Sequence, residues 1–435
     1  MRGQATTIDV RPSSDAATNA VPAAIAVLVG SRPQFRPIPC EHGTTILGRL
    51  LDSGLPEDDE SSRKHAELTF VGGKLRVRDL DSRNGTYLNG QRIGDTTVSE
   101  LPCVLRTGST VFLVVADARM LLGGVAMDDR GVVGSTLGAT LGRIARAALT
   151  TDTLLVTGET GTGKERAARA FHDGGPGSNG PFLAINCATI PHGVAERLLF
   201  GTVKGAYSGA DAAAPGYIAA ADGGTLFLDE IGELDPLVQP KLLRVLETRE
   251  VLPLGASRPT QVSTRFCFAT MRKLRAAMQD GRFRADLFYR IAREEIEMPP
   301  LRERREEIPW LVAFAIARVA PELALTAKLV EACLLRPWPG NVRELLAAAE
   351  RAAGLAREQR KDSVRDTHLD RNAGLLGSAS ETAAKPAQAL TRDVVEQAIA
   401  EHKGNLAATA RHLGLHRSHF YRLLKQLAID PREAD

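Results

Sequence analysis

The spacing of apolar residues changes along the chain. Between residues 22 and 120, short alternating runs such as Ala66–Val71 and Lys74–Arg78 are separated by Gly-Gly, Asn-Gly and Asp-containing turns. Apolar residues at every second position are typical of strands with one buried face, and such turns are typical of hairpins. We therefore predict an all-β antiparallel domain over residues 22–120. The preceding residues 1–21, which lack any apolar period, are predicted to be a flexible tail.

A different pattern begins near residue 133. Apolar strands, predicted at Thr153–Thr157, Thr225–Leu228 and Arg265–Thr270, alternate with longer stretches of helical period up to residue 300. Strands alternating with helices are typical of an α/β fold with a parallel sheet. From residue 301 to 372 only the helical period remains, which predicts an all-helical domain following the α/β core.

The C-terminal segment contains two further parts. Residues 373–388 are rich in Gly, Ala and Ser without apolar period, which predicts a linker. Residues 389–432 form a last helical unit, in which Asn405 caps a helix that ends at Leu413-Gly414 and a second helix begins near Arg417. This spacing predicts an all-α helix-turn-helix.

Composition adds few constraints. A length of 435 residues with 43% hydrophobic and 25% charged residues fits about two to four globular domains. The five cysteines are far apart and lack CxxC spacing, which favours a reducing compartment. The apolar stretch Val21–Gly30 is too short to cross a membrane, and the N-terminus lacks a signal-peptide pattern. We expect a soluble cytoplasmic protein.

Candidate chemistry begins at a glycine-rich loop. Gly158-Glu-Thr-Gly-Thr-Gly-Lys164 follows an apolar strand and opens a helix, which is the context of a phosphate-binding P-loop. Backbone N–H groups of such a loop surround phosphates, and the Lys164 ammonium reaches the β and γ phosphates. The alternative is a glycine-rich turn without a ligand. Glu165 stands where the general pattern has a hydroxyl ligand for magnesium.

Two carboxylates follow a second buried strand. Asp229 is placed to hold magnesium through water, and Glu230 to polarise the attacking water. The alternative is that both residues cap the helical turn that begins at Ile231.

Four motifs together resemble one family over residues 133–355. They are the P-loop with Glu165, Gly205–Ala210, Phe283–Arg290 and Trp338–Leu345. This set is similar to the AAA+ ATPase core and helical lid of sigma-54-dependent, NtrC-type transcription activators. The resemblance implies ATP and Mg²⁺ as cofactors and an ATP-binding set of Gly158, Glu159, Thr160, Gly161, Thr162, Gly163, Lys164, Glu165, Asp229 and Arg343.

The same resemblance implies the catalytic residues. Glu230 would act on water, Asn186 would restrain Glu230, and Arg284 and Arg290 would reach the nucleotide of a neighbouring subunit, which requires a ring, usually a hexamer. At the position where the family commonly has a hydrogen-bonding asparagine, this chain has Met271. A thioether cannot replace an amide there.

The motif Gly205–Ala210 resembles the loop with which the family contacts sigma-54. Tyr207 and Ser208 replace the usual phenylalanine and threonine, so an aromatic ring and a hydroxyl are kept. The implied contact set is Gly205, Ala206, Tyr207, Ser208, Gly209 and Ala210.

The N-terminal β domain contains, in order, the motifs Gly48-Arg49, Ser62–His65 and Asp81–Thr86. This ordered set resembles the forkhead-associated (FHA) domain, a β-sandwich that reads phosphothreonine. The guanidinium groups and the hydroxyl suit a phosphate, and the implied phosphopeptide-binding set is Arg49, Ser62, Arg63 and Asn84. Asn84-Gly85 and Asn89-Gly90 also fit plain hairpin turns, and His65 is assigned to loop architecture.

The C-terminal unit resembles the Fis-type helix-turn-helix. From His402 to Ile429 there are five cationic residues and no acidic ones. Core positions are assigned to Phe420, Leu423 and Leu427, which leaves a predicted DNA-binding set of Arg417, Ser418, His419 and Arg422. A solvated basic helix is the alternative.

Together these features predict an ATP-driven activator that remodels sigma-54 RNA polymerase. Expected partners are the polymerase, upstream promoter (enhancer) DNA, further copies of the chain and a phosphothreonine protein, with control by a Ser/Thr kinase. The alternative is a phosphopeptide-dependent DNA-binding scaffold whose ATPase binds nucleotide but hydrolyses it weakly, and Met271 suggests that reading. An AAA+ remodeller of another substrate is a third reading, which the loop Gly205–Ala210 disfavours.

Overall fold

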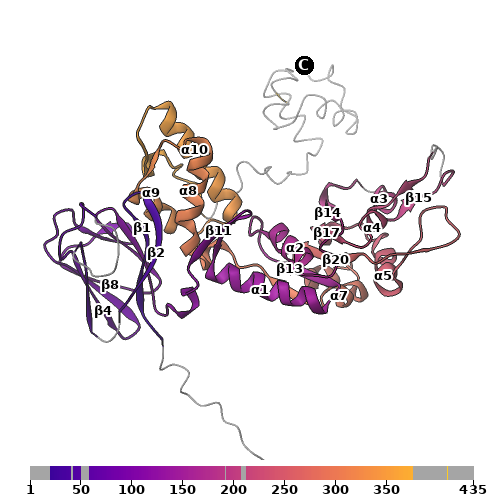
Figure 1. Cartoon of the computed structure of the whole chain (residues 1–435), viewed down its shortest axis with the longest axis horizontal. Coiled ribbons are helices and arrows are strands. Elements are labelled where there is room, and N and C mark those ends of the chain that lie inside the picture. Colours follow the sequence, from indigo (N-terminus) through magenta and orange to yellow (C-terminus); the bar gives the residue numbers. More distant parts are fainter. Residues whose placement is uncertain are drawn as a thin grey trace, which may run out of the picture. The chain divides into compact units, whose positions relative to one another are not determined.

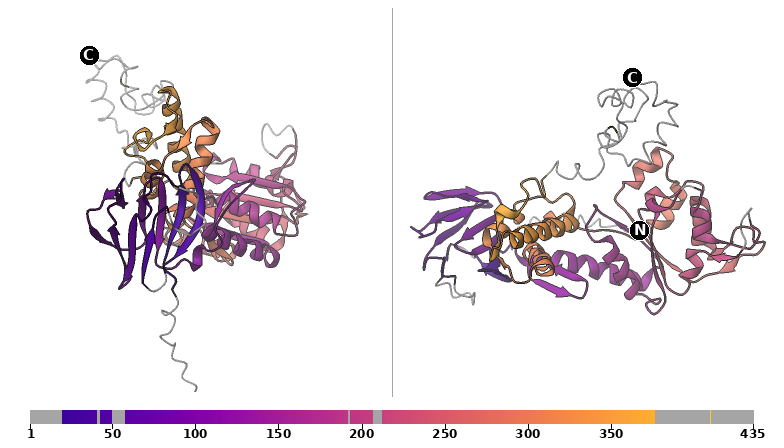
Figure 2. Two further views of the ribbon diagram at one scale, coloured as in Figure 1. Left: turned by 60° about the vertical axis from the view of Figure 1, so that its left-hand side comes forward. Right: turned by 90° about the horizontal axis from the view of Figure 1, so that it is seen from above.

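Strands between Ala23 and Val115 form two antiparallel sheets, seen in Figures 1 and 2. This computed structural model describes residues 20–40, 43–49, 58–191, 193–206, 212–375 and Thr409. The first sheet has the order β2 (Arg32–Pro39), β1 (Ala23–Val29), β10 (Thr110–Val115), β9 (Cys103–Thr107), β6 (Thr86–Leu88) and β7 (Gln91–Arg92). The second has the order β3 (Thr44–Leu47), β4 (Ala66–Val71), β5 (Lys74–Asp79) and β8 (Thr96–Ser99).

The core of this sandwich follows the two-residue period of the strands. Ala24 and Ala26 of β1 and Phe112 and Val114 of β10 point into the space between the sheets, where they join a buried apolar cluster with residues of the second sheet. The alternating residues of the same strands point to the opposite face of the first sheet. The predicted all-β antiparallel domain is therefore confirmed.

A parallel five-stranded sheet forms the next part. Its order is β14 (Phe182–Asn186), β17 (Thr225–Asp229), β20 (Arg265–Thr270), β13 (Thr153–Thr157) and β21 (Glu295–Glu297). The associated helices are α1 (Ser135–Thr150), α2 (Lys164–Asp173), α3 (Ala195–Phe200), α4 (Tyr217–Ala220), α5 (Gln239–Thr248), α6 (Leu274–Gln279) and α7 (Ala285–Ile291). Since all five strands are parallel, their carboxyl ends meet at one edge, where ligands bind in open α/β sheets.

Short two-stranded sheets lie outside the parallel sheet. Two of them are antiparallel pairs next to the parallel sheet: β15 (Gly201–Thr202) with β16 (Ala214–Pro215), and β18 (Glu250–Val251) with β19 (Thr260–Gln261). A third, the hairpin of β11 (Val125–Asp128) and β12 (Gly131–Gly134), leads from the sandwich into α1. The sequence had not predicted this hairpin.

The lid follows the parallel sheet in sequence. Its helices are α8 (Ile308–Val319), α9 (Ala327–Leu334) and α10 (Asn341–Glu358). The expectation of helices alone was incomplete, because β22 (Ala324–Leu325) and β23 (Ser363–Val364) form a short parallel pair. Two-residue strands carry no readable period, so the pattern could not reveal them. The domain boundaries given above stay predictions.

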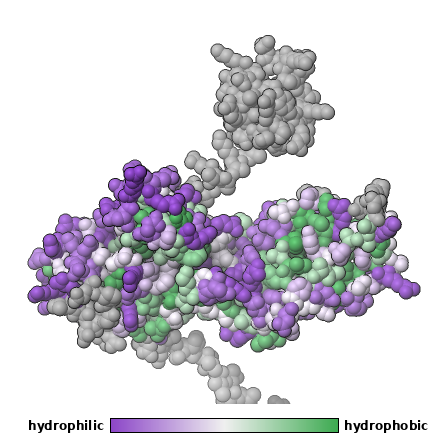
Figure 3. Space-filling view, turned by 45° about the horizontal axis from the view of Figure 1, so that its top comes forward, coloured by the Kyte–Doolittle hydropathy of each residue, from purple (hydrophilic) through white to green (hydrophobic). Residues whose placement is uncertain are grey.

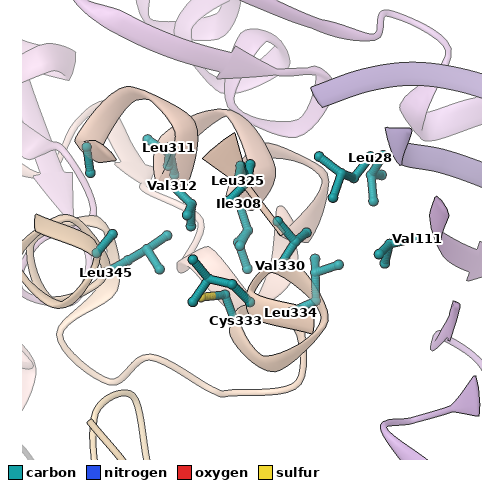
Figure 4. Close-up of a cluster of buried hydrophobic side chains, with 14 of the residues drawn as sticks. Leu28, Val111, Ile308, Leu311, Val312, Leu325, Val330, Cys333, Leu334 and Leu345 are labelled. Atoms are coloured by element: carbon teal, nitrogen blue, oxygen red, sulfur yellow. The ribbon is translucent and has the colours of Figure 1, made fainter. Parts of the chain in front are cut away.

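The lid shares its apolar core with the outer face of the first sandwich sheet. Leu28 of β1 and Val111 of β10 pack in one cluster with Val330 and Leu334 of α9, and Figure 4 shows these side chains from the two domains approaching one another. Every residue of β1 is consequently buried. The sandwich and the lid thus form one continuous packed body.

Much of the visible surface is hydrophilic, with hydrophobic side chains gathered in patches, as Figure 3 shows. Within the described residues, no helix is both long enough and apolar enough to cross a membrane.

Buried charge lies where the lid meets the start of the α/β core. The guanidinium of Arg304 donates to Glu307 at 2.8 Å, and the other Glu307 oxygen accepts the Gly134 N–H at 2.7 Å. The neighbouring Glu306 is 1% exposed, and its burial raises the pKa of this carboxyl to about 7. A methyl group on Gly134 would lie 2.6 Å from Oε1 of Glu306 and 2.8 Å from Cγ of Glu307, so these buried side chains would have to shift.

We expect Glu306→Gln to stabilise the fold above neutral pH and to change little in acid. Because the folded pKa of about 7 exceeds the ordinary 4.5, the stability contributed by the protonated carboxyl is complete below pH 4.5 and is lost as pH rises towards 7. The lost part amounts to at most about 3 kcal/mol.

Urea unfolding of the wild type and of Glu306→Gln at about pH 4 and about pH 8 measures this difference. The exposed neighbour provides a control, Glu303→Gln. Equal pH dependence in the wild type and Glu306→Gln would contradict the assignment.

Candidate nucleotide site

The P-loop connects β13 to α2 at the carboxyl edge of the parallel sheet. Gly158, Gly161 and Gly163 have φ angles of 148°, 77° and 100°, a region that side chains with a Cβ rarely adopt. These angles bend the loop, and Gly163 directly precedes the first turn of α2. A bent loop before a helix N-terminus presents N–H groups to an anion.

Lys164 lies at the base of this loop. Its ammonium donates to the carbonyl oxygens of Gly158 at 3.1 Å and Glu159 at 3.4 Å, and its Nζ lies 3.7 Å from Oε1 of Glu230. The side chain is only 8% exposed. This places a buried positive charge between the P-loop and the acidic pair at the end of β17.

The acidic pair lies where the sequence analysis placed it, at the end of a buried strand. Asp229 ends β17, and its Oδ1 accepts the backbone N–H of Glu230 at 3.0 Å. Glu230 has a left-handed φ of 50°, which turns the chain sharply after the strand. The alternative role as helix caps is not seen for Glu230, since the following 3-10 turn, Ile231–Glu233, begins without a side-chain cap.

Glu230 is held by the residue that directly follows the neighbouring strand β20. The backbone N–H of Met271 donates to its Oε2 at 3.2 Å, so a main-chain group supplies a hydrogen bond where the Met271 side chain cannot. The thioether of Met271 instead accepts the hydroxyl of Thr160 at 3.2 Å. Asn186, which ends β14, uses its Oδ1 to accept the Ala188 N–H at 2.9 Å.

The P-loop, the acidic pair and the lid enclose a cavity of about 720 Å³. Predicted residues that line it are Thr160, Gly161, Thr162, Gly163, Lys164, Glu165, Asn186, Asp229, Glu230 and Arg343. Its polar floor fits phosphates. The remaining lining includes apolar residues suited to a planar base: Val132, Leu137, Leu311, Phe314, Val342 and Leu346. Sequence reasoning missed this apolar wall, because its residues come from four separate elements.

Glu165 lies in the first turn of α2 and lines the same cavity. Its carboxylate accepts a hydrogen bond from Arg169 at 3.0 Å, one helical turn further on. This exposed pair orients Glu165 along the helix surface.

The start of α10 is attached to the P-loop through Asn341, a residue that the sequence analysis did not single out. Its buried amide donates to Glu159 and to the Thr160 carbonyl, each at 3.0 Å, while its Oδ1 accepts the Leu301 N–H at 2.7 Å. The next residue, Val342, donates its N–H to the carbonyl of Gly161 at 3.1 Å. Glu159 therefore contacts the lid, and it also pairs with Arg302 at 2.8 Å.

Of the two candidate trans arginines, Arg284 directly precedes α7 and Arg290 lies in its last turn, and both are outside the cavity lining. Arg284 pairs with Asp286 at 2.7 Å and is half exposed, and Arg290 donates to the Leu246 carbonyl at 2.6 Å. Desolvation lowers the pKa of Arg290, with the nearby Arg293 adding to the effect. Between them Tyr289 is 65% exposed. The structure does not bring these arginines into the cavity of their own chain.

The FHA candidates gather at one end of the sandwich. The Arg49 N–H donates to the Ser62 carbonyl at 3.0 Å, and the Asn84 amide donates to the Glu60 carbonyl at 2.7 Å. Arg63 is exposed on the same loop. Gly48 is required beside it, since a methyl group there would lie 2.4 Å from the Arg63 carbonyl oxygen.

Ser62 is arranged as a donor. Its Oγ accepts the Arg83 N–H at 3.1 Å, which leaves its own proton free for an incoming oxygen. Its N–H donates to Nδ1 of the fully buried His65, whose Nε2 lies 3.2 Å from the Gly85 carbonyl and so carries the ring proton. Burial lowers the pKa of His65, in agreement with an Nδ1 that accepts the Ser62 N–H.

Two predicted sets lie wholly or partly outside the described residues. Gly205 and Ala206 are described, and Gly205 has a left-handed φ of 80°. Tyr207, Ser208, Gly209 and Ala210 lie outside, as do the DNA-binding candidates Arg417, Ser418, His419 and Arg422.

A P-loop on a parallel sheet, a helical lid and a β-sandwich define a multidomain protein of the AAA+ ATPase class. The sigma-54 interaction domain matches residues 134–297 and the AAA+ ATPase lid domain residues 302–385. The FHA domain matches residues 45–112, and the Fis family of bacterial regulatory proteins matches residues 390–427. The chain belongs to the sigma-54-dependent activators, and the predicted fold class is confirmed.

Known relatives are regulators. The chain is 40% identical over 297 residues to the anaerobic nitric oxide reductase transcription regulator NorR of Aeromonas hydrophila, covering 63% of this chain and 58% of NorR. It is 41% identical over 257 residues to the Nif-specific regulatory protein of Herbaspirillum seropedicae, covering 58% of this chain and 47% of that protein. The crystal structure of NtrX from Brucella abortus superposes with a TM-score of 0.51 at 31% identity, covering 67% of this chain and 68% of NtrX.

Proposed function

We propose that this chain hydrolyses ATP in an oligomeric ring and uses the energy to remodel sigma-54 RNA polymerase at promoters, under control of phosphothreonine recognition. One observation carries the ATP-hydrolysing part of the proposal. The P-loop, Asp229 and Glu230 meet in a single cavity that the lid residue Arg343 also lines. A fold that only bound nucleotide would not need a carboxylate such as Glu230 beside the phosphates, where it can act on water.

The chemistry follows from the positions of these side chains. Lys164 and the P-loop N–H groups would bind the phosphates, and Asp229 would hold Mg²⁺ through water, since all of them line the cavity. The ion would neutralise charge on the phosphate oxygens. Glu230, fixed by the Met271 N–H, orients and polarises the attacking water. Arg343 contacts the nucleotide from the lid of the same subunit.

Oligomerisation completes the site. Arg284 directly precedes α7, and Arg290 lies on it beside the exposed Tyr289; neither arginine lines the cavity of its own chain. A planar guanidinium that acts on the γ-phosphate from outside must come from a second subunit. We propose a ring, a hexamer as is usual in the family, in which each α7 faces the cavity of its neighbour.

The output side of the proposal rests on family membership. The loop Gly205–Ala210 would contact sigma-54, and the Fis-type unit would hold the ring on enhancer DNA through Arg417, Ser418, His419 and Arg422. Relatives named as transcription regulators support this role.

The input side rests on the FHA loops. Arg49 and Arg63 supply positive charge, Ser62 supplies a free hydroxyl donor, and Asn84 would hold the peptide backbone. A phosphothreonine protein, with its Ser/Thr kinase, is the partner that this cluster fits.

A second candidate is a phosphopeptide-dependent DNA-binding scaffold with weak hydrolysis. The contact of the Met271 thioether with Thr160 favours it, because an amide at this place could hydrogen-bond the nucleotide or water. The hydrolysis rate of the wild-type chain separates the two functions.

We expect Glu230→Gln to keep ATP binding and to lower turnover by about 100-fold or more, since only the group that acts on water is lost. Steady-state hydrolysis and titration with a fluorescent ATP analogue measure the two effects. Glu233→Gln, a nearby acid outside the cavity lining, serves as the control. Hydrolysis at the wild-type rate in Glu230→Gln would assign the base elsewhere.

Arg290→Ala should lose hydrolysis while nucleotide affinity changes less than about threefold, because the guanidinium acts on a neighbouring subunit. Lys164→Ala should be inactive through loss of phosphate binding. Mixing these two inactive proteins should recover activity at interfaces that combine an intact cavity with an intact arginine. Absence of recovery in rings shown by mass spectrometry to contain both proteins would refute the trans role.

Arg49→Ala in the full chain should weaken phosphothreonine peptide binding by about tenfold or more, because a charge-assisted hydrogen bond is lost. Arg76→Ala, which removes an exposed arginine of β5, should leave peptide affinity unchanged. Calorimetric titration with matched phosphorylated and unphosphorylated peptides measures this. Equal affinity for both peptide forms in the wild type would end the phosphate-reading proposal.

A further inference from the structure

The outer face of the first FHA sheet is an interface with the ATPase lid. Val104 of β9 and Val111 and Leu113 of β10 alternate with the sandwich core residues and join the lid cluster instead. Their partners on α9 are Val330 and Leu334, as Figure 4 shows for Val111. Burial of this apolar face stabilises contact between the domains without fixing one orientation.

A buried ion pair fixes the orientation. Nε of Arg106 on β9 donates to Oε2 of Glu331 on α9 at 2.7 Å, and the two side chains are 8% and 7% exposed. The guanidinium also lies 3.8 Å from the ring centroid of Tyr87. Two charges removed from water are costly unless their geometry is maintained, so the sandwich and the lid must move together or break this pair.

On the sandwich side of the ion pair, the hairpin that carries Arg106 contacts the phosphopeptide loops. The turn after β9 holds Asp58, which accepts the Ser109 N–H at 3.1 Å and hydroxyl at 2.6 Å, and the Thr110 hydroxyl at 2.7 Å. Gly108 packs so closely against the same loop that a methyl group would lie 2.6 Å from the carbonyl carbon of Glu60. Arg106 donates to the Gly108 carbonyl at 3.4 Å. The loop carrying Ser62 is therefore built on the hairpin that carries Arg106.

On the lid side of the ion pair, the lid contacts the P-loop and lines the candidate nucleotide cavity. Helix α10 holds the P-loop through Asn341 and lines the cavity with Arg343. The sandwich is also joined to the α/β core by the β11–β12 hairpin, where Asp128 pairs with Arg166 of α2 at 2.6 Å. Any movement of the lid against the core on nucleotide binding must consequently be accommodated by the FHA domain.

We infer that the phosphopeptide site and the nucleotide site are thermodynamically linked through the Arg106–Glu331 pair. Arg106 and Glu331 are positioning residues: neither touches the nucleotide, and each acts through the orientation of the lid. This inference rests on the proposed function and names its regulation. By linkage, a peptide that changes nucleotide affinity has its own affinity changed by the same factor.

The test uses the full chain, a non-hydrolysable ATP analogue and a phosphothreonine peptide selected on that chain from a degenerate library. Each ligand is titrated with and without saturating amounts of the other. We expect affinity changes of at least about fivefold that are equal in both directions. Arg106→Glu and Glu331→Arg each place like charges at the interface. In either variant, the affinity for one ligand should change by less than about twofold when the other ligand is bound.

The double variant Arg106→Glu with Glu331→Arg should recover the wild-type change in affinity, because the opposite charges are paired again. If the single variants only damaged the fold, combining them would not recover it. Lys74→Glu reverses one charge of the exposed Lys74–Glu100 pair on the other sheet and should leave the factor unchanged. Three results would overturn the inference. The wild type could show no change in the affinity for one ligand when the other is bound, or the single variants could show the same change as the wild type. The double variant could also fail to recover the change that the single variants lose.

The outcomes also separate this inference from the proposed function. Phosphopeptides that bind without changing nucleotide affinity would overturn the linkage alone. Failure of every phosphopeptide to bind would overturn the proposed input function and the linkage with it.

Discussion

The attachment of the lid to the P-loop at Asn341 is the contact on which the rest of the site depends. The cavity lies between the carboxyl edge of the parallel sheet, the β11–β12 hairpin, α1 and the lid helices α8 and α10. The buried Asn341 amide joins α10 to the P-loop by hydrogen bonds to Glu159 and Thr160. Asn341 is fully buried, so losing these bonds would leave its amide without a partner. The lid is therefore held so that Arg343 lines the same cavity as Lys164.

The lid also packs against the FHA sandwich. Apolar residues of β1 and β10 and the Arg106–Glu331 pair place the sandwich against α9. Input loops, lid and P-loop then form one series of packed contacts. Through these contacts, binding at the FHA loops can affect the position of the lid and thereby the candidate nucleotide site.

The sequence predicted the parts that local pattern determines. The strands at Thr153–Thr157 and Arg265–Thr270 were placed correctly because strand period and flanking turns are local properties. The domain interface and the role of Asn341 depend on contacts between distant segments, so spacing could not reveal them. One signal was available: the continuous apolar run Ala23–Val29 lacks the alternation of a half-solvated strand, and both of its faces are buried.

The central claim is that hydrolysis needs a neighbouring subunit, and its dependence on protein concentration tests this most directly. Specific ATPase activity, measured over a dilution series with sedimentation of the same samples, should rise with the fraction of assembled rings. It should approach background where the chain is monomeric, since Arg284 and Arg290 lie outside the cavity lining of their own chain. Constant specific activity down to the monomer would contradict the account.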